Sequence, residues 1–344
     1  MGTWPAVAAR SVGKRLLQGG WLIVEREGTP MAGSHLSTAP MREALSSVDI
    51  RTLTRIDDML PIEELQQLIW GYDKPYPARL LLVVAETGGQ VLGAYCQGRM
   101  IGFAFMLYAR GQGGEGPYLH SQLVGVLPEY RDQNVGFLLK LAQRQYALEL
   151  GIDKIEWTFD PLQGRNGYFN VRKLGTVIRR YRSNYYGRLD STFTRAIASD
   201  RCFAEWFVRT PRIERRISGQ GPELTLAAAL RPPYVSVTQI ELLTGGVPRL
   251  VEYRLGLEAE RLVVEVPADF QPIMAEITLA EEWRAKTRDI FRHYLNERGY
   301  MVTDCVSGLE GSRRRNLYIL SSPAVAGEVF AGAGTSHTAR REAR

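Results

Sequence analysis

A strand, a short polar loop and the start of a helix follow one another over residues 124–139, the segment with the clearest chemical signal in the chain. Pro128 ends the apolar strand, and Gly136 falls in the first turn of the expected helix. The first backbone N–H groups of a helix lack partners inside it, and the helix dipole favours negative charge at that end. The sequence therefore predicts an anion site here, of the kind that binds a pyrophosphate.

This segment resembles the cofactor motif of the GNAT superfamily of acyl-CoA-dependent N-acyltransferases. That motif ends in (Gln/Arg)-x-x-Gly-x-(Gly/Ala), and Arg131-x-x-Asn134-x-Gly136 matches it with one departure. Asn134 stands where the family prefers glycine, but asparagine also tolerates a left-handed backbone, so the turn can form. The resemblance implies that the pyrophosphate of coenzyme A is bound, largely through the backbone, by Arg131, Asp132, Gln133, Asn134, Val135, Gly136 and Phe137.

The same resemblance implies that the strand before the loop pairs with the pantetheine arm of coenzyme A through Val124 and Val126. Gly125 between them is expected to mark a bulge that parts two neighbouring strands and admits this arm. Asn166 is also assigned to the cofactor. The expected co-substrate is acetyl-CoA or another acyl-CoA.

Later motifs are similar to a two-domain prokaryotic subgroup of the family, and the similarity spans residues 49–321. These motifs include Trp157 to Leu162, Lys173-Leu174-Gly175, Tyr186-Gly187, Pro267 to Gln271 and Trp283-Arg284. The resemblance implies an α/β fold, a GNAT-like acyl-CoA N-acyltransferase fold with a mixed central sheet flanked by helices. A second, smaller α+β domain is expected to follow it.

Acyl transfer to an amine needs a base for the amine, a donor for the oxyanion and a proton for the departing thiolate. The backbone N–H near Val124 is the natural oxyanion donor. His120 is the candidate base, because its even spacing from Gln122 and Val124 predicts that all three side chains point to one face. A histidine with a purely structural role is the alternative.

The proton donor departs from the family pattern. The family often uses a tyrosine four residues before the glycine that closes the second helix, and this chain has Val171 there. Tyr168, Tyr181 and Tyr185 are the substitutes, with a packed aromatic as the alternative for each. Asp160, at a strand end, either binds the acceptor or starts a loop, and we favour the loop.

Other chemistry finds little support in the sequence. Residues 111–116 satisfy the pattern GxGxxG, but they join two β-rich runs instead of opening a helix, so we expect a hairpin loop. There is no P-loop sequence, GxSxG elbow or HExxH motif, and the four histidines are scattered. We therefore expect no metal.

The length, charge and cysteine content of the chain limit the domains and partners that we expect. The chain has 344 residues, of which 45% are hydrophobic, so two globular domains are expected. Its 43 Lys and Arg against 37 Asp and Glu give +6, and arginine clusters such as 179–182 raise nucleic-acid binding as an alternative. With a net charge this small, we favour a solvated face over a nucleic-acid site for these clusters.

No apolar run reaches the roughly 18–20 residues that span a bilayer, so no membrane partner is expected. Three widely spaced cysteines favour a reducing, cytoplasmic location.

Apolar periodicity predicts the elements that position these residues. Strands are expected over 50–53, 91–95, 100–108, 118–126, 152–158, 177–181, 189–193, 262–266, 300–304 and 316–320. Helices are expected over 57–69, 134–150, 166–174 and 275–298. Gln97-Gly98 predicts a hairpin turn, and Gly151, Gly175 and Gly299 predict helix ends. We find no internal repeat at a fixed period.

The expected organisation is a disordered or over-extended start (1–47), a GNAT-like acyl-CoA-binding domain (49–200), a C-terminal α+β domain (201–322) and a disordered tail (323–344). The predicted function is transfer of an acyl group, with acetyl favoured, from coenzyme A to an amine of an unidentified acceptor by direct attack. The alternative is a non-catalytic acyl-CoA-binding or regulatory module, motivated by Val171. The second domain is expected to shape the acceptor pocket or a homodimer contact.

Overall fold

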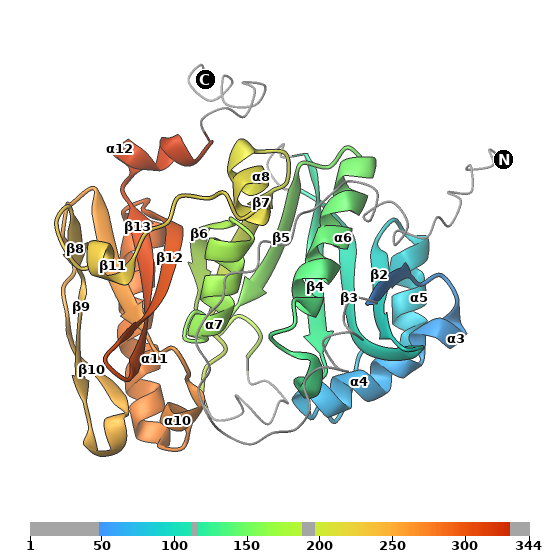
Figure 1. The fold of residues 1–344 in the computed structure, drawn as a ribbon, viewed down its shortest axis with the longest axis horizontal. Coiled ribbons are helices and arrows are strands. Elements are labelled where there is room, and N and C mark those ends of the chain that lie inside the picture. The colour runs from blue at the N-terminus through green and yellow to red at the C-terminus, as the bar shows by residue number, and fades with distance from the viewer. Residues whose placement is uncertain (1–47, 112–115, 188–196, 331–344) are drawn as a thin grey trace. The chain divides into compact units, whose positions relative to one another are not determined.

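The computed structural model describes residues 48–111, 116–187 and 197–330 (Figure 1). Contacts divide the chain into two compact units, residues 1–150 and 151–344. The predicted disordered start, the centre of the 111–116 loop, the strand over 189–193 and the tail beyond residue 330 lie outside the described residues. The predicted domain boundary at residues 200/201 is a different division and stays a prediction.

The first unit has four antiparallel strands in the order β1-β2-β3-β4. Its elements, in chain order, are β1 (Asp49–Thr52), α3 (Ile56–Met59), α4 (Pro61–Trp70), α5 (Ala78–Glu86), β2 (Gln90–Cys96), β3 (Arg99–Arg110), β4 (Pro117–Val126), η1 (Pro128–Tyr130) and α6 (Val135–Glu149). The predicted strands and helices of this unit are confirmed. The sequence left the segment of α5 unassigned.

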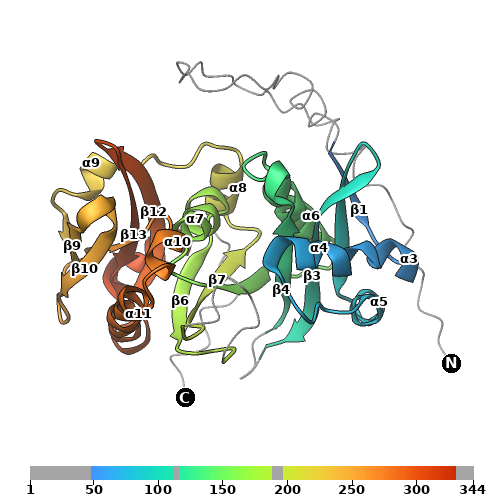
Figure 2. The same ribbon diagram turned by 90° about the horizontal axis from the view of Figure 1, so that it is seen from below.

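Two cores cover the two faces of this sheet, and the alternation of side chains along β3 separates them. Phe103 and Phe105 pack with Ile62 of α4 and Leu81 of α5. Ala104, between them in sequence, packs with Leu139 and the rest of the α6 face. Helices α4 and α5 therefore lie on one face of the sheet and α6 on the other (Figure 2).

Turn chemistry in this unit follows the sequence. Gln97 and Gly98 both have positive φ, 49° and 80°, as a tight β-hairpin turn requires, so the predicted hairpin is confirmed. Helix α4 begins with Pro61 at its first position and ends at Gly71 with a φ of 64°. Gly151, directly after Leu150 at the end of α6, has a φ of 70°, which confirms the predicted stop.

The second unit has seven strands in the order β5-β7-β6-β12-β13-β11-β8 and a separate pair, β9 and β10. All neighbours described are antiparallel except β8 and β11, so this sheet is mixed, as the fold class predicts. Its elements begin with β5 (Lys154–Phe159), α7 (Gly164–Gly167), η2 (Tyr168–Lys173), β6 (Val177–Arg182), β7 (Arg201–Phe207), α8 (Pro211–Ile217), α9 (Leu226–Ala229) and β8 (Tyr234–Ser236). They continue with β9 (Thr238–Leu242), η3 (Thr244–Gly246), β10 (Pro248–Tyr253), β11 (Arg261–Val266), α10 (Gln271–Met274), α11 (Ile277–Phe291), η4 (Arg292–Glu297), β12 (Met301–Glu310), β13 (Arg313–Ser321), α12 (Pro323–Ala326) and η5 (Gly327–Phe330).

Two features of this unit differ from the sequence predictions. Residues 201–207, expected to open the second domain, form strand β7, which pairs with both β5 and β6. The predicted disordered tail begins too early, because residues 323–330 form α12 and η5, with Ala326 buried and the ring of Phe330 5.2 Å from that of Phe207. The other expected strands and helices within the described residues are confirmed.

Candidate functional site

The loop between β4 and α6 has the predicted strand-turn-helix form. Leu127 still donates a backbone hydrogen bond to the carbonyl of Ile101 (2.9 Å), so the sheet ends there. Pro128 then opens one 3₁₀ turn, η1, and α6 begins at Val135. Residues 131–134 are left as a short connection between the two.

Two residues of this connection have left-handed backbone. Asp132 and Asn134 both have a φ of 61°, a conformation that asparagine and aspartate tolerate better than other non-glycine residues. Asn134, at the position where the family motif has glycine, thus adopts the backbone that glycine would supply. The prediction that this turn can form with asparagine is confirmed.

The start of α6 is open. Asn134 is its N-cap, yet the Asn134 side chain makes no capping hydrogen bond, and the first intrahelical bond runs from the N–H of Leu138 to the carbonyl of Asn134 (3.0 Å). A Cβ placed on Gly136 would meet only Val126 Cγ2, at 3.9 Å. The N-cap side chain thus leaves the first N–H groups of this 15-residue helix unused, and within the described residues there is room beside Gly136.

Neighbouring side chains fold back from this opening. Arg131 donates from Nε to the carbonyl of Val126 (3.3 Å), and Gln133 donates from Nε2 to the carbonyl of Glu129 (2.8 Å). Val135 is buried in the core under α6, while Asp132 is exposed and Phe137 half-buried. The structure thus brings the seven predicted loop residues together around the helix start.

Strand β4 carries a bulge, but at Gln122 and not at Gly125 as predicted. The register with β3 shifts between Phe105 opposite Leu123 and Met106 opposite Ser121, which leaves Gln122 as the extra residue. Gly125 pairs regularly with Phe103. A Cβ there would lie 2.7 Å from Trp70 and 2.9 Å from Ile69, so glycine at this position allows close packing against α4.

The bulge also corrects the predicted alignment of His120, Gln122 and Val124. One extra residue resets the alternation of side chains along the strand. Val124 and Val126 pack on the α6 side. His120 is opposite Leu107, on the face of Phe103 and Phe105.

His120 therefore lies on the α4/α5 face, and the three residues do not share one face. Gln122 marks the same side, since its Nε2 donates to the hydroxyl of Tyr76 (3.0 Å) and that ring lies 5.5 Å from Phe105. His120 is half-buried. A catalytic role for His120 stays a prediction.

The sequence analysis missed Lys140, which lies on the inner face of α6 with 3% of its surface exposed. Its Nζ donates to Ser121 Oγ (2.8 Å), which in turn donates to Gln143 Oε1 (3.0 Å). Burial lowers the pKa of Lys140 well below its ordinary value. The available signal was a single lysine between Leu139 and Ala142, on the face of the helix that is expected to be buried.

No protein-family model matches the sequence, and no curated protein matches it significantly. Many solved structures resemble it in fold. An IAA acetyltransferase from Bacillus cereus matches 46% of this chain and 99% of its own, at 16% identity and a TM-score of 0.37. The ribosomal-protein-S18-alanine N-acetyltransferase from Escherichia coli matches 47% and 94%, at 15% identity and a TM-score of 0.38.

A GNAT family acetyltransferase from Elizabethkingia anophelis, solved with acetyl-CoA bound, matches 46% of this chain and 97% of its own, at 14% identity and a TM-score of 0.34. Each of these matches covers about half of this chain and nearly all of its own, so another region of this chain lies outside them.

In the second unit, the usual GNAT tyrosine position is closed. Val171 is fully buried in η2. Its side chain carries no proton that a departing thiolate could accept. Tyr168, the first residue of η2, is half-buried, and Asn166 of α7 is exposed. Whether Asn166 and Tyr168 contribute to the GNAT-like cofactor site stays a prediction.

Tyr181 is buried in the second unit, and its catalytic role stays a prediction. It is 2% exposed, its hydroxyl donates to Asp200 Oδ2, and its ring stacks on Phe291 at 5.7 Å. Burial, reinforced by the charge of Asp200, strongly raises the pKa of Tyr181. A hydroxyl held in this way is a poor source of a proton for a thiolate.

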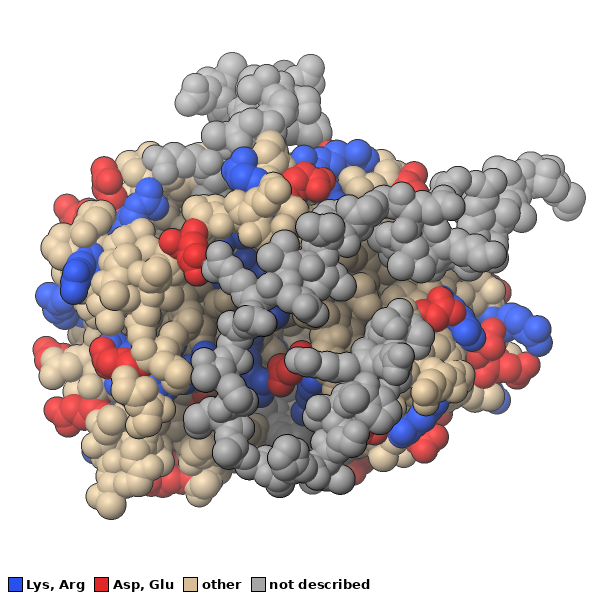
Figure 3. Space-filling view, viewed as in Figure 1, with Lys and Arg blue, Asp and Glu red and all other residues tan. Residues whose placement is uncertain are grey.

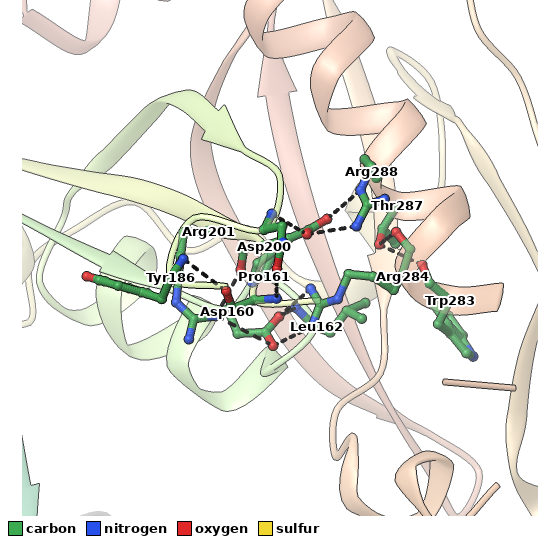
Figure 4. Close-up of polar contacts among 12 residues, drawn as sticks. Asp160, Pro161, Leu162, Tyr186, Asp200, Arg201, Trp283, Arg284, Thr287 and Arg288 are labelled. Atoms are coloured by element: carbon green, nitrogen blue, oxygen red, sulfur yellow. Dashed lines mark hydrogen bonds and ion pairs between the residues drawn. The ribbon is translucent and has the colours of Figure 1, made fainter. Parts of the chain in front are cut away.

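Two aspartates and two arginines form a network of ion pairs in the second unit (Figure 4). Arg284 of α11 binds both oxygens of Asp160 (2.8 and 2.5 Å), and Arg288, one turn later, binds both oxygens of Asp200 (2.9 Å each). Asp160 Oδ1 also accepts from the N–H of Leu162 (2.9 Å), so the loop role favoured for Asp160 is confirmed.

The arginine clusters are largely paired within the chain. A bulge in β6 places Arg179 and Arg180 opposite Phe203, and they bind Glu205 and Glu156. On the described surface seen in Figure 3, basic and acidic residues are interspersed. No described helix is long and apolar enough to cross a membrane, and no group of three or more metal-ligating side chains gathers among the described residues.

Proposed function

We propose that the chain is an acyl-CoA-dependent N-acyltransferase whose β4-α6 loop binds the diphosphate of the cofactor. The observation that carries the proposal is the start of α6, where left-handed Asn134 leaves the helix without an N-cap hydrogen bond from its side chain and, within the described residues, a Cβ on Gly136 has room. The dipole of a 15-residue helix and its unpaired N–H groups suit a dianionic group at this place. Bound there, acyl-CoA supplies an activated acyl group.

The charge and backbone of the residues around the loop suit coenzyme A. Arg131 is exposed and lies one turn from the helix start, so its charge is available near a diphosphate. Val124 and Val126 of β4 lead directly to the loop, which suits the proposed pairing of their backbone with the pantetheine arm. Asn166 is retained as a cofactor residue on resemblance alone.

In the proposed reaction, the amine nitrogen attacks the thioester carbonyl carbon, the carbon–sulfur bond breaks, and an amide forms. His120 takes the proton from the amine, and a backbone N–H near Val124 donates to the oxyanion. The departing thiolate accepts a proton, for which Tyr168 and Tyr185 remain candidates because the Tyr181 hydroxyl is bonded to Asp200. The acceptor is an amine of unidentified structure.

The alternative is a non-catalytic acyl-CoA-binding module, favoured by fully buried Val171 at the usual position of the acid. Release of free thiol from acetyl-CoA in the presence of a panel of amines separates the two. An enzyme gives amine-dependent release, whereas a binding module gives saturable binding without it.

Calorimetric titration of the full chain with acetyl-CoA tests the site itself. Gly136→Glu places a carboxylate where the diphosphate is proposed, while its Cβ meets nothing closer than 3.9 Å. We expect binding to be abolished and the fold to survive. Gln145→Glu is the matched control, because it adds the same charge on an exposed position of the same helix. Unchanged affinity in Gly136→Glu would contradict the assignment.

A further inference from the structure

The second unit contains two segments with the same order of elements: a strand, a helical stretch and two more strands (Figure 1). The first segment, residues 154–207, holds β5, α7 with η2, β6 and β7, and the second segment, residues 261–321, holds β11, α10, α11 with η4, β12 and β13. In each, the last strand lies between the other two and is antiparallel to both. The strand order β5-β7-β6-β12-β13-β11 is therefore the same read from either end.

The helix ends of the two segments correspond residue by residue. Both finish in a six-residue π-helical turn, η2 from Tyr168 and η4 from Arg292, which start 124 positions apart. The turns are closed by the same pair of backbone bonds. Leu174 donates to Phe169 and Thr176 to Asn170, while Arg298 donates to His293 and Tyr300 to Tyr294. A left-handed glycine follows in each, Gly175 (φ 82°) and Gly299 (φ 69°), again 124 positions apart.

The first strand after each helix has a bulge at the same place. The register of β6 with β7 shifts after Ile178, and that of β12 with β13 shifts after Val302. Ile178 and Val302 are also 124 positions apart, and they are directly opposite each other where β6 pairs with β12. Equivalent residues that face each other in an antiparallel pair lie on a local two-fold axis.

Packing across this axis is reciprocal. The helical turn η4 packs on β6, and η2 packs on β12. Asn296 of η4 bonds both the N–H (3.1 Å) and the carbonyl (2.9 Å) of Tyr181. Arg172, 124 positions before Asn296, binds Asp304 of β12 (3.1 Å). Each segment thus uses the same point of its helical turn to hold the second strand of the other.

We infer that the second segment is a diverged copy of the first, joined to it about a two-fold axis between Ile178 and Val302, and that its helix α11 has become the positioning element for the strand ends of the first. This inference does not depend on the proposed function, since both segments lie outside the β4-α6 loop.

The spacing between counterparts explains why the sequence shows no fixed period. Cys202 lies between Phe159 and Tyr181 in the sheet, and Tyr318 lies between Val264 and Cys305 in the same way. Counterparts are therefore 105 residues apart in the first strand, 124 in the second and 116 in the third. The prediction of no repeat holds for a fixed period, while insertions and deletions hide a repeat in structure.

The copies differ most in their helices. Residues 164–167 form a single turn, α7, whereas α11 has 15 residues. The counterparts of Asp160 and Asp200, one residue after Phe159 and two before Cys202, are Glu265 and Asn316. Glu265 takes its arginines from the neighbouring strand, Arg313 and Arg315 of β13. Among the described residues, Asp160 and Asp200 of the first segment both receive their arginines from α11, the helix of the second segment. Within those same residues, their counterparts in the second segment receive none from the helix of the first.

Arg288 acts through Asp200 on the loop after β6. Asp200 Oδ1 accepts from the N–H of Asn184 (2.8 Å), and Oδ2 accepts from the Tyr181 hydroxyl. The next residue, Tyr185, donates its N–H to the carbonyl of Ser199 (3.0 Å). With both oxygens of Asp200 fixed by Arg288, this carboxylate can hold the loop of residues 183–187 in one conformation.

Hydrogen–deuterium exchange of the full chain tests the positioning role. In Arg288→Gln we expect the amide of Asn184 to exchange at least about tenfold faster, because a hydrogen bond to a charged group loses its support. Arg288→Lys keeps the charge and should restore part of the protection. Arg292→Gln, an exposed arginine one turn further on, is the matched control and should change nothing in this loop.

Two outcomes would overturn the inference. Unchanged exchange at residues 183–187 in Arg288→Gln would remove the positioning role. An equal increase in the exchange rate over all strands of the second unit would show that Arg288 only stabilises the fold as a whole.

A crystal structure tests the duplication, because the two segments must superpose by a two-fold rotation. None of these readouts uses acyl-CoA, so failure of the proposed function would leave them unaffected.

Discussion

The ammonium group of Lys140 lies 2.8 Å from the hydroxyl of Ser121, joining the inner face of α6 to the strand that precedes the candidate site. Burial lowers the pKa of this lysine, so between its folded and unfolded pKa values the unfolded chain binds more protons. The stability of the wild-type chain should therefore rise with pH across this window.

Lys140→Met tests this linkage. We expect the variant to be more stable than the wild type at neutral pH, and the difference to shrink as the pH approaches about 10, the ordinary pKa of lysine. Urea unfolding at several pH values measures it. Lys173→Met, at an exposed lysine, is the control. Parallel pH profiles for Lys140→Met and the wild type would contradict the expectation.

Gly136→Ala should move stability and affinity in opposite directions. Alanine is the better helix former, and its Cβ has room, so we expect a gain of about 0.5 kcal/mol in unfolding free energy. The same methyl group enters the proposed diphosphate site, and acetyl-CoA binding should weaken about tenfold, or about 1.4 kcal/mol. Urea unfolding and calorimetry measure the two effects, and equal or tighter binding would count against the site.

Asn134 tests the left-handed turn. Because its side chain does not cap α6, replacing it changes little besides the backbone preference. Asn134→Gly should lie within about 0.5 kcal/mol of the wild type, whereas Asn134→Ala should lose about 1 kcal/mol, since alanine pays for a positive φ. Chemical unfolding of the two variants side by side decides this, and equal stabilities would refute the explanation.

Tyr181→Phe separates structure from catalysis. Removing the hydroxyl takes a hydrogen bond from buried Asp200, so we expect a loss of about 1–2 kcal/mol at neutral pH. Burial by itself would raise the pKa of Asp200, but the hydrogen bonds from Arg288 and Tyr181 lower it below its ordinary value. Asp200 therefore contributes stability above its unfolded pKa, and that contribution disappears as the pH falls through the folded pKa.

The deficit of Tyr181→Phe should consequently narrow in acid. Any amine-dependent thiol release per folded molecule should match the wild type. A large loss of turnover with unchanged stability would return Tyr181 to the list of proton donors.

Local signals made much of the fold predictable. The helix stop at Gly151, the turn at Gln97-Gly98 and the helix start after Asn134 all follow from residues that act within a few positions of themselves. The cofactor loop belongs to this class, because its backbone geometry is set by its own residues.

What escaped prediction depends on partners distant in sequence. The bulge at Gln122 exists only relative to β3, so counting by twos along β4 put His120 on the wrong face. The contacts of Tyr181 with Asp200 and Phe291 also join residues that are distant in sequence. The sequence of strand β7 does not reveal that it pairs between β5 and β6.

The bulge of β6 has a consequence for the surface charge. Glu156 and Glu205 are direct cross-strand neighbours and both are buried, an arrangement that repels unless each carboxylate is neutralised. The extra residue in β6 turns Arg179 and Arg180 to the same side, one over each glutamate. An arginine that already has an internal counterion releases no salt when a polyanion approaches. Arg179 and Arg180, each held by a buried glutamate, are therefore poor contacts for a nucleic-acid backbone, although they belong to the most conspicuous arginine cluster of the sequence.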